Sequence, residues 1–348
     1  MRWIYGGYGV GNLGDDLLLI SALNKWGKDC KVISYGIPQI DFDVKFIDFN
    51  LFINNLDLIS SNTDEFIIGG GGVFWSEGHI NDIFKIAKHI KKIGGKFIVD
   101  SIGTQGCSSA PEIVEKIIEL SDDFTVRDRD SIRQLKMHNI SNLHKVRQSE
   151  DLALIIDYSQ FKNIQIESKK TIVAINYAVP NAGIEEFESF VGAISKISDI
   201  LAENFEFYYL GHTRHNLTID ENDYITAENF RVISRNRVKS FIPTNVKDLL
   251  GFYKSVDLTI GFRYHMSVIS IAMNIPNLSI SFGYGKYFAI ADEKDTSHLN
   301  IRDKDKGYIC EKILKWIEEN PVIENNRTSG TSGTLGTSGT SKSIDKKI

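Results

Sequence analysis

A glycine-rich stretch close to the beginning of the chain constrains its fold more than any other feature. Residues 6–16 read Gly-Gly-Tyr-Gly-Val-Gly-Asn-Leu-Gly-Asp-Asp, and five of the first nine are glycines. Glycine tolerates positive φ angles and lets the backbone approach a ligand closely. The apolar residues 3–5 predict a strand before this stretch, and residues 17–26 predict a helix after it. We therefore expect the turn of a βα unit that forms one wall of a ligand site.

The last three glycines are spaced Gly-x-Gly-x-x-Gly, which matches a dinucleotide-binding motif, but the surrounding residues argue against a dinucleotide. Asp15 and Asp16 open the predicted helix, where their carboxylates would take up the free amides and repel a pyrophosphate. The second predicted strand, residues 31–35, ends at Gly36 without an acidic residue that could hold a ribose. We expect the loop to face an uncharged, hydroxyl-rich ligand.

Apolar and amphipathic segments alternate along most of the chain, and long connections between strands require parallel pairing with helices outside the sheet. The first series predicts strands at 3–5, 31–35, 44–47, 65–68, 96–102 and 123–128, with helices at 17–26, 80–93, 111–121 and 131–139. A second series predicts strands at 171–177, 205–210, 231–234, 258–260 and 278–282, with helices at 184–204, 245–256, 264–274 and 307–319.

The chain of 348 residues exceeds the length that a single core usually supports. Periodicity lapses over a polar stretch between the two series. The predicted units are an N-terminal Rossmann-like α/β domain (1–156), a linker (157–169), a C-terminal Rossmann-like α/β domain with a closing helix at 307–320 (170–326), and a flexible Thr/Ser/Gly tail (327–348).

Composition excludes several classes of protein. The net charge of −5 argues against a nucleic-acid binder. The three cysteines are scattered without a CxxC pair, so we predict neither a disulfide framework nor a metal site. Apolar runs stay short of the roughly 18 residues of a membrane span, and the N-terminus lacks the order of a signal peptide. We therefore expect a cytoplasmic protein.

Six short motifs follow one another at the ends of predicted strands. They are the stretch 6–16, Gly69-Gly70-Gly71-Gly72, Gly103-Thr104-Gln105-Gly106, Val126-Arg127-Asp128, Asp151-Leu152-Ala153 and Gly261-Phe262-Arg263-Tyr264-His265. In this order they resemble the polysaccharide pyruvyltransferases over about residues 1–295. The sequence departs from the family's pattern at Gly7, where an aromatic residue is usual, and at 103–106, which spaces out the usual Gly-Gln-Gly.

The resemblance implies an enzyme that transfers pyruvate from phosphoenolpyruvate to a saccharide as a ketal and releases phosphate. The acceptor would be a cell-surface polysaccharide or its precursor, including a lipid-linked one, which would bring the protein to the inner face of the membrane. No cofactor is implied beyond phosphoenolpyruvate as the donor substrate. The implied architecture is two Rossmann-like domains that face each other across a cleft, as in GT-B enzymes. The N-terminal domain would bind the acceptor and the C-terminal domain the donor.

Phosphoenolpyruvate carries a phosphate and a carboxylate, so its site needs cations. Arg263 follows a strand and precedes a helix, where a guanidinium can bind an oxyanion bidentately beside the helix dipole; it could instead neutralise a neighbouring carboxylate. Arg127 is the second predicted anion ligand, and its alternative is a salt bridge with Asp128 or Asp130. Lys286 lies near the position of a family lysine, one residue later than usual.

His265 is the predicted proton donor. The resemblance and the chemistry agree on this role, because the vinyl methylene must be protonated before a sugar hydroxyl attacks, and histidine titrates near neutral pH. A second hydroxyl then displaces phosphate and closes the ketal ring. The alternative is that His265 packs at a domain face.

Residues of the first half are predicted to bind the acceptor. Tyr8 and Asn12 could stack on and hydrogen-bond to a sugar, although both also suit a turn. Gly71 allows close backbone approach, while Trp75 and Glu77 could line the acceptor pocket.

Two other functions stay open. One is a GT-B glycosyltransferase that uses a nucleotide sugar, for which Asp292 or Glu293 could bind the ribose. The other is a non-catalytic saccharide-binding relative, against which the joint presence of Arg263 and His265 speaks. The sequence leaves the acceptor sugar and the oligomeric state undetermined.

Overall fold

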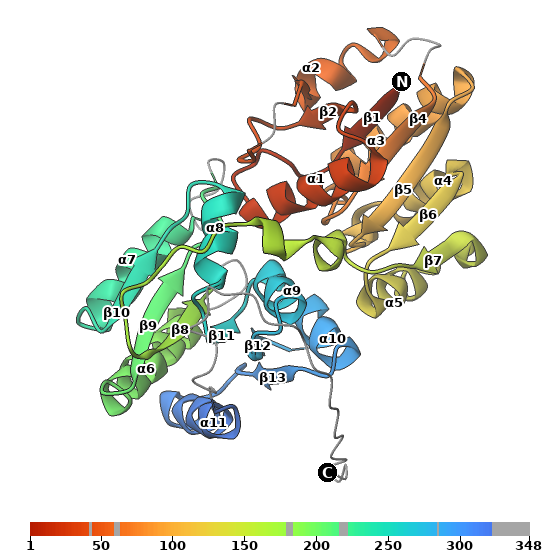
Figure 1. Cartoon of the computed structure of the whole chain (residues 1–348). Helices are drawn as coiled ribbons and strands as arrows, with labels where there is room; N and C mark the ends of the chain where they lie inside the picture. Colours follow the sequence, from red (N-terminus) through yellow and green to blue (C-terminus); the bar gives the residue numbers. More distant parts are fainter. Residues whose placement is uncertain (42–43, 59–62, 179–183, 216–221, 284, 322–348) are drawn as a thin grey trace, which may run out of the picture.

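The chain forms two parallel β-sheets with helices packed around them, one sheet after the other along the sequence (Figure 1). All paired strands of both sheets are parallel, which confirms the predicted α/β class. The predicted tail, 327–348, lies outside the described residues. The computed structural model describes residues 1–41, 44–58, 63–178, 184–215, 222–283 and 285–321.

The first sheet runs in the order β3-β2-β1-β4-β5-β6-β7. Its strands are β1 (Arg2–Tyr5), β2 (Lys31–Ser34), β3 (Phe46–Asp48), β4 (Glu65–Gly69), β5 (Lys96–Ile102), β6 (Asp123–Val126) and β7 (Val146–Gln148). The helices of this half are α1 (Leu13–Trp26), α2 (Phe49–Ile53), α3 (Glu77–Lys92), α4 (Pro111–Leu120) and α5 (Arg129–Met137). Short 3-10 helices are η1 (Leu56–Leu58), η2 (Cys107–Ser109), η3 (Leu143–Lys145), η4 (Leu152–Ile155) and η5 (Tyr158–Gln160).

Strand β5 shows why this sheet is covered on both faces. Successive side chains of a strand point to opposite faces. Phe97 and Val99 join the core formed with α3 and α4, whereas Ile98 joins the core that contains α1. A strand that is buried on both sides needs apolar residues at nearly every position, which is the pattern that predicted it.

The second sheet runs in the order β10-β9-β8-β11-β12-β13. Its strands are β8 (Thr171–Asn176), β9 (Phe205–Leu210), β10 (Val238–Phe241), β11 (Leu258–Gly261), β12 (Asn277–Ser281) and β13 (Ser297–Asn300). Its helices are α6 (Ile184–Ile200), α7 (Asp223–Ile233), α8 (Val246–Tyr253), α9 (Tyr264–Ala272), α10 (Lys286–Glu293) and α11 (Lys306–Glu319). Between the sheets, residues 161–169 form no helix or strand and run along the second half, where the amide of Ile164 donates to the carbonyl of Gly251 (3.0 Å).

One predicted strand, residues 231–234, is wrong. These residues end helix α7 instead, and its buried face includes Phe230. Val232 and Ile233, which suggested a strand, are 65% and 42% exposed and point away from the core. The strand at this edge of the sheet is β10, a few residues later. Each helix within the described ranges is too short or too polar to cross a bilayer.

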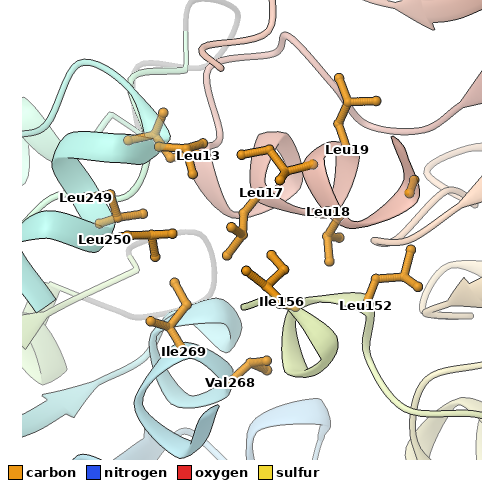
Figure 2. Close-up of a cluster of buried hydrophobic side chains, with 14 of the residues drawn as sticks. Leu13, Leu17, Leu18, Leu19, Leu152, Ile156, Leu249, Leu250, Val268 and Ile269 are labelled. Carbon is orange, nitrogen blue, oxygen red and sulfur yellow. The ribbon is translucent and has the colours of Figure 1, made fainter. Parts of the chain in front are cut away.

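Helix α1 joins the two halves through a shared apolar core. Figure 2 shows Leu17 of α1 close to Leu249 and Leu250 of α8 and to Ile156 beyond η4. Ile269 of α9 belongs to the same buried cluster. Because these residues come from both sides of the linker, burying them fixes how the two sheets face each other.

The loops that follow β1 and β9 are hydrogen-bonded to each other. The amide of Leu13 donates to the carbonyl of His212 (2.9 Å), and the amide of Arg214 donates to the carbonyl of Gly11 (2.7 Å). A side chain at Gly11 would place its Cβ 2.6 Å from the Arg214 carbonyl oxygen, so glycine is required there. The carboxyl ends of the two sheets therefore meet, which is where open α/β sheets bind ligands.

Candidate active site in the interdomain cleft

A pocket of about 730 Å³ lies between the carboxyl ends of the two sheets. The first half lines it with Val10, Asn12, Asp15, Tyr35, Phe49, Asn50, Gly72, Trp75, His79, Asp82, Gln105 and Arg127. The second half lines it with His212, His215, Arg263, Tyr264, His265, Lys286 and Tyr287. A larger hollow of about 1080 Å³ lies between the linker and the second half, and none of the predicted site residues lines it. The interdomain pocket is therefore the candidate active site.

Arg263 is held in this pocket by a buried carboxylate. It precedes the first residue of α9, and its Nη2 donates to Oδ1 of Asp223 (2.9 Å). Asp223 is fully buried and also accepts the amides of His212 (2.7 Å) and Thr213 (2.9 Å). The guanidinium thus has the carboxylate partner that was its alternative role, and it also reaches the pocket, with its side chain 14% exposed.

Arg127 lies at the end of β6 between two buried carboxylates. Its Nε donates to Asp128 (3.2 Å) and its Nη1 to Asp151 (3.4 Å). The ring of Tyr264 lies 3.9 Å from the guanidinium carbon. The pairing with Asp128 was the expected alternative, whereas Asp130 pairs with Arg133. Although its side chain is only 2% exposed, Arg127 lines the pocket.

His265 sits in the first turn of α9 and packs against helix α1 of the other half. A Cβ at Gly14 would lie 2.2 Å from the His265 Nδ1, so only glycine fits there. Among the described residues, the Nε2 of His265 has no hydrogen-bond partner. Burial, and then the charges of Arg127 and Lys286, hold the pKa of His265 well below its usual value. These protein groups keep the imidazole neutral at pH 7, which differs from the near-neutral titration that its residue type predicts.

Lys286 begins helix α10 and also lines the pocket. Its Nζ lies 5.9 Å from the ring centre of Tyr264 and 5.2 Å from that of Tyr287. The structure therefore brings the predicted proton donor and the three predicted cations to one pocket.

The predicted acceptor residues divide into two groups. Asn12 and Trp75 line the pocket. Tyr8 does not, because its ring is fully buried and its hydroxyl donates to the carbonyl of Gly69. Stacking of Tyr8 on a sugar is therefore incompatible with this structure.

The two other predicted acceptor residues lie outside the lining of the pocket. Gly71 is buried, with the neighbouring Gly72 at the surface of the pocket instead. Glu77 begins α3 and is exposed, but it is not among the lining residues.

Trp75 is part of an aromatic surface of the pocket, of which the sequence revealed only Trp75 itself. Trp75 stacks on His79, with ring centres 4.6 Å apart and planes 13° apart. The hydroxyls of Tyr5 and Tyr35 lie 2.7 and 3.2 Å from the two ring nitrogens of His79. Burial lowers the pKa of His79 to about 4, so its ring is neutral. We call Trp75, His79 and Tyr35 the aromatic wall.

The start of α1 differs from the expectation that Asp15 and Asp16 take up the free amides of the helix. Asn12 caps the helix, since its Oδ1 accepts the amide of Gly14 (3.0 Å). Asp16 accepts the amides of Gly9 (2.8 Å) and Gln39 (2.9 Å), so it fixes the glycine-rich loop. Asp15 faces the pocket. Both aspartates belong to the first motif. The sequence does not show which of them faces the pocket, because this depends on how helix α1 is oriented.

The two parallel sheets that face each other across the pocket define a fold of the GT-B-like class, and solved structures support it. It resembles MnaA of S. aureus in its UDP complex (13% identity, 91% of this chain and 88% of that chain, TM-score 0.61). It also resembles UDP-GlcNAc 2-epimerase of Neisseria meningitidis bound to UDP-GlcNAc (13% identity, 91% of this chain and 92% of that chain, TM-score 0.57). A third similar structure is Alr3699/HepE of Anabaena in complex with UDP-glucose (9% identity, 94% of this chain and 93% of that chain, TM-score 0.63). The predicted GT-B-like architecture is confirmed.

The chain belongs to the polysaccharide pyruvyl transferase family, whose model matches residues 12–284. The matched range begins at the cap of α1 and includes the Arg263 and His265 pair. No curated protein matches the sequence at a significant level. The family resemblance predicted from the ordered motifs is confirmed.

Proposed function

We propose that this enzyme transfers pyruvate from phosphoenolpyruvate to a saccharide as a ketal and releases phosphate. The observation that carries the proposal is the gathering of Arg127, Arg263, Lys286 and His265 in one pocket, which the aromatic wall also lines. A donor with two anionic groups suits the cations, and a sugar suits the aromatic wall, which offers apolar faces with polar atoms at their edges.

The electrostatics support a defined order of events. Arg263 and Lys286 would bind the phosphate and carboxylate of the donor, with Arg127 behind them. The negative charge of the donor would offset the cations that depress the pKa of His265, so donor binding would favour the protonated imidazole. His265 would then protonate the methylene carbon, and C2 would become open to attack by a sugar hydroxyl.

We further propose that the acceptor is a cell-surface polysaccharide or its precursor. A lipid-linked precursor would bring the enzyme to the inner face of the membrane, and we place the reaction in the cytoplasm. No cofactor is part of the proposal. Trp75 lines the pocket and is 46% exposed, which leaves room for an acceptor larger than a single sugar.

The nucleotide-sugar alternative receives less support. Its predicted ribose ligands, Asp292 and Glu293, do not line the pocket. Glu293 accepts the amide of Arg129 and the side chain of Gln148 (3.2 Å), so it joins the two halves instead. The structures with UDP, UDP-GlcNAc or UDP-glucose show nucleotide binding by those similar proteins only.

Calorimetry of phosphoenolpyruvate against UDP-glucose tests the proposal. Lys286→Met should weaken phosphoenolpyruvate binding at least tenfold, because it removes a cation that faces the pocket. Arg263→Gln should cost about 2–5 kcal/mol of binding, and Arg147→Gln, at an exposed arginine, is the matched control. Unchanged donor affinity in both folded pocket variants would place the anion site elsewhere. Binding and turnover of UDP-glucose, with none of phosphoenolpyruvate, would favour glycosyl transfer.

A further inference from the structure

A carboxyl group of the first half faces the pocket and has no role in the donor site. Asp15 lies in the first turn of α1 and is half-buried at the surface of the pocket. Its neighbour Asp16 points to the opposite side, where backbone amides bind it. The two carboxylates therefore do different work, although they are adjacent in the sequence.

The carboxyl of Asp15 is fixed by its surroundings. The Nδ2 of Asn12 donates to its Oδ2 (2.9 Å). Two glycines leave room for the carboxyl: a Cβ at Gly71 would lie 3.0 Å from its Oδ1, and a Cβ at Gly7 would lie 3.4 Å from its Oδ2. A Cβ at Gly71 would crowd the carboxyl, whereas one at Gly7 would make an ordinary contact with it.

Asp15 lies in the same pocket as the aromatic wall and His265. The position of a Cβ at Gly7 is 3.4 Å both from the Asp15 Oδ2 and from the Cζ2 of Trp75, so the carboxyl is close to the edge of the wall. On its other side, the adjacent residue Gly14 touches the imidazole of His265. A sugar stacked on the wall would therefore present hydroxyls to Asp15 and to the donor together.

The charges around Asp15 suit a group that exchanges protons at working pH. Burial, the largest influence, and the neighbouring Asp16 and Asp151 raise its pKa, while Arg127 and Lys286 lower it. The result is a pKa of about 7. A carboxylate of this kind is a stronger base than an exposed one, and a catalytic base works best near the ambient pH.

We propose that Asp15 is the catalytic base that accepts the proton of the acceptor hydroxyl when its oxygen bonds to C2 of the donor. This inference rests on the proposed function. The imidazolium of His265 gives its proton to the methylene carbon, whose new C–H bond takes the electron pair of the double bond. The acceptor oxygen then bonds to C2, its O–H bond breaks, and that proton passes to the Asp15 carboxylate.

The remaining step balances without another group. The second hydroxyl bonds to C2 as the bond from C2 to the phosphate oxygen breaks, and the phosphate leaves with the electron pair and takes the second hydroxyl proton. Asp15 has then gained one proton and His265 has lost one. Exchange with solvent, or between these two groups across Gly14, returns the site to its starting state.

Kinetics and binding of Asp15→Asn test the assignment. The amide keeps the hydrogen-bonded shape but cannot accept a proton. We expect phosphoenolpyruvate affinity within about threefold of the wild type, measured by calorimetry, and a kcat that is lower by about 10²–10⁴-fold. Glu112→Gln, in the exposed first turn of α4, is the matched control and should leave both values unchanged.

Two further measurements separate a base from a positioning residue. With phosphoenolpyruvate saturating, so that the bound donor holds His265 protonated, kcat should rise with pH as Asp15 ionises, and this limb should disappear in Asp15→Asn. Formate should raise the activity of Asp15→Ala at least tenfold, because it can enter the space of the missing carboxyl. It should not raise the activity of Asp15→Asn.

Turnover of Asp15→Asn within tenfold of the wild type would overturn the assignment, as would a persisting acid limb or an Asp15→Ala variant that formate does not rescue. Should Asp15→Asn lose its fold, the wild-type pH profile and formate rescue decide the matter. Failure of the wild-type enzyme to use phosphoenolpyruvate would refute the proposed function itself, which is a separate outcome.

Discussion

Gly14→Ala tests a close contact between the two halves at the candidate active site. Gly14 lies in the first turn of α1. A methyl group there would overlap the His265 ring, with its carbon 2.2 Å from Nδ1 and 2.6 Å from Cγ. His265 therefore has to rotate, or the two halves have to move apart.

Two opposing effects set the magnitude. Alanine is a better helix former than glycine by about 1 kcal/mol. Overpacking of a tight contact costs about 1–3 kcal/mol. We expect a net loss of up to about 2 kcal/mol in the free energy of unfolding. The loss of activity should be larger, since a 1 Å misplacement of a catalytic group can cost about 10²-fold.

Chemical denaturation and steady-state kinetics measure the two effects separately. Gly78→Ala is the matched control, because Gly78 lies in the first turn of α3 and a Cβ there would meet no atom within 4 Å among the described residues. That variant should be as stable as the wild type or more so, and fully active. In the double variant Gly14→Ala/His265→Ala the contacts with Nδ1 and Cγ are gone and only the one with the Cβ of residue 265 (2.8 Å) remains, so stability should recover in part while activity does not.

The reasoning fails if Gly14→Ala behaves like Gly78→Ala in both stability and turnover. It also fails if removing the ring in the double variant leaves the stability loss of Gly14→Ala unchanged. Either result would mean that His265 does not contact the start of α1 in solution.

Three further predictions concern the acceptor, the buried ion pairs and acid stability. Trp75→Ala should raise the KM for the saccharide about tenfold, equivalent to ~1.4 kcal/mol, and leave the affinity for phosphoenolpyruvate unchanged in calorimetry. Arg127→Leu should lower the free energy of unfolding by about 3–5 kcal/mol in denaturant titrations, because it leaves Asp128 and Asp151 buried without their countercharge. Burial lowers the pKa of His212 from 6.5 to about 4, so stability that is present above pH 6.5 should be lost as the pH falls towards 4, by about 3 kcal/mol; His212→Gln should flatten this part of the plot of Tm against pH.

Each of these predictions has an outcome that contradicts it. A weaker donor affinity in Trp75→Ala would place the donor on the aromatic wall. Wild-type stability of Arg127→Leu would show that the two carboxylates are protonated or hydrated in solution. An unchanged acid limb in His212→Gln would assign the acid sensitivity to other neutral histidines, of which His79 is the first candidate.

Much of the fold could be predicted because strands that are buried in a parallel sheet appear in the sequence as short apolar runs. Strands β5 and β9 begin and end where the sequence predicted them, since glycine or asparagine flanks each of them on both sides. The strand predicted at 231–234 failed because two exposed apolar residues at the end of α7 imitate a buried strand. Strand pairing and helix phase depend on partners that are distant in the sequence.

The cations and the histidine of the candidate site could also be predicted. Arg127 follows β6 directly and Arg263 follows β11 after one residue, and the carboxyl ends of parallel strands share one edge of a sheet. The carboxylates that hold them, Asp151 and Asp223, could not be paired with them from sequence, because each lies in another segment. The aromatic wall was hidden for the same reason, since Tyr35 and His79 come from separate elements.

The sequence by itself determined the two α/β sheets, the family and the residues that carry charge at the cleft. Only the tertiary structure decided which of these residues hold protons. Asp15 has a pKa of about 7 and the pKa of His265 lies well below its usual value, which reverses the order expected for an exposed carboxylate and imidazole. A pKa depends on burial and on charges that are close in space, and residues from the two ends of the chain reach those distances only when both sheets have folded and met.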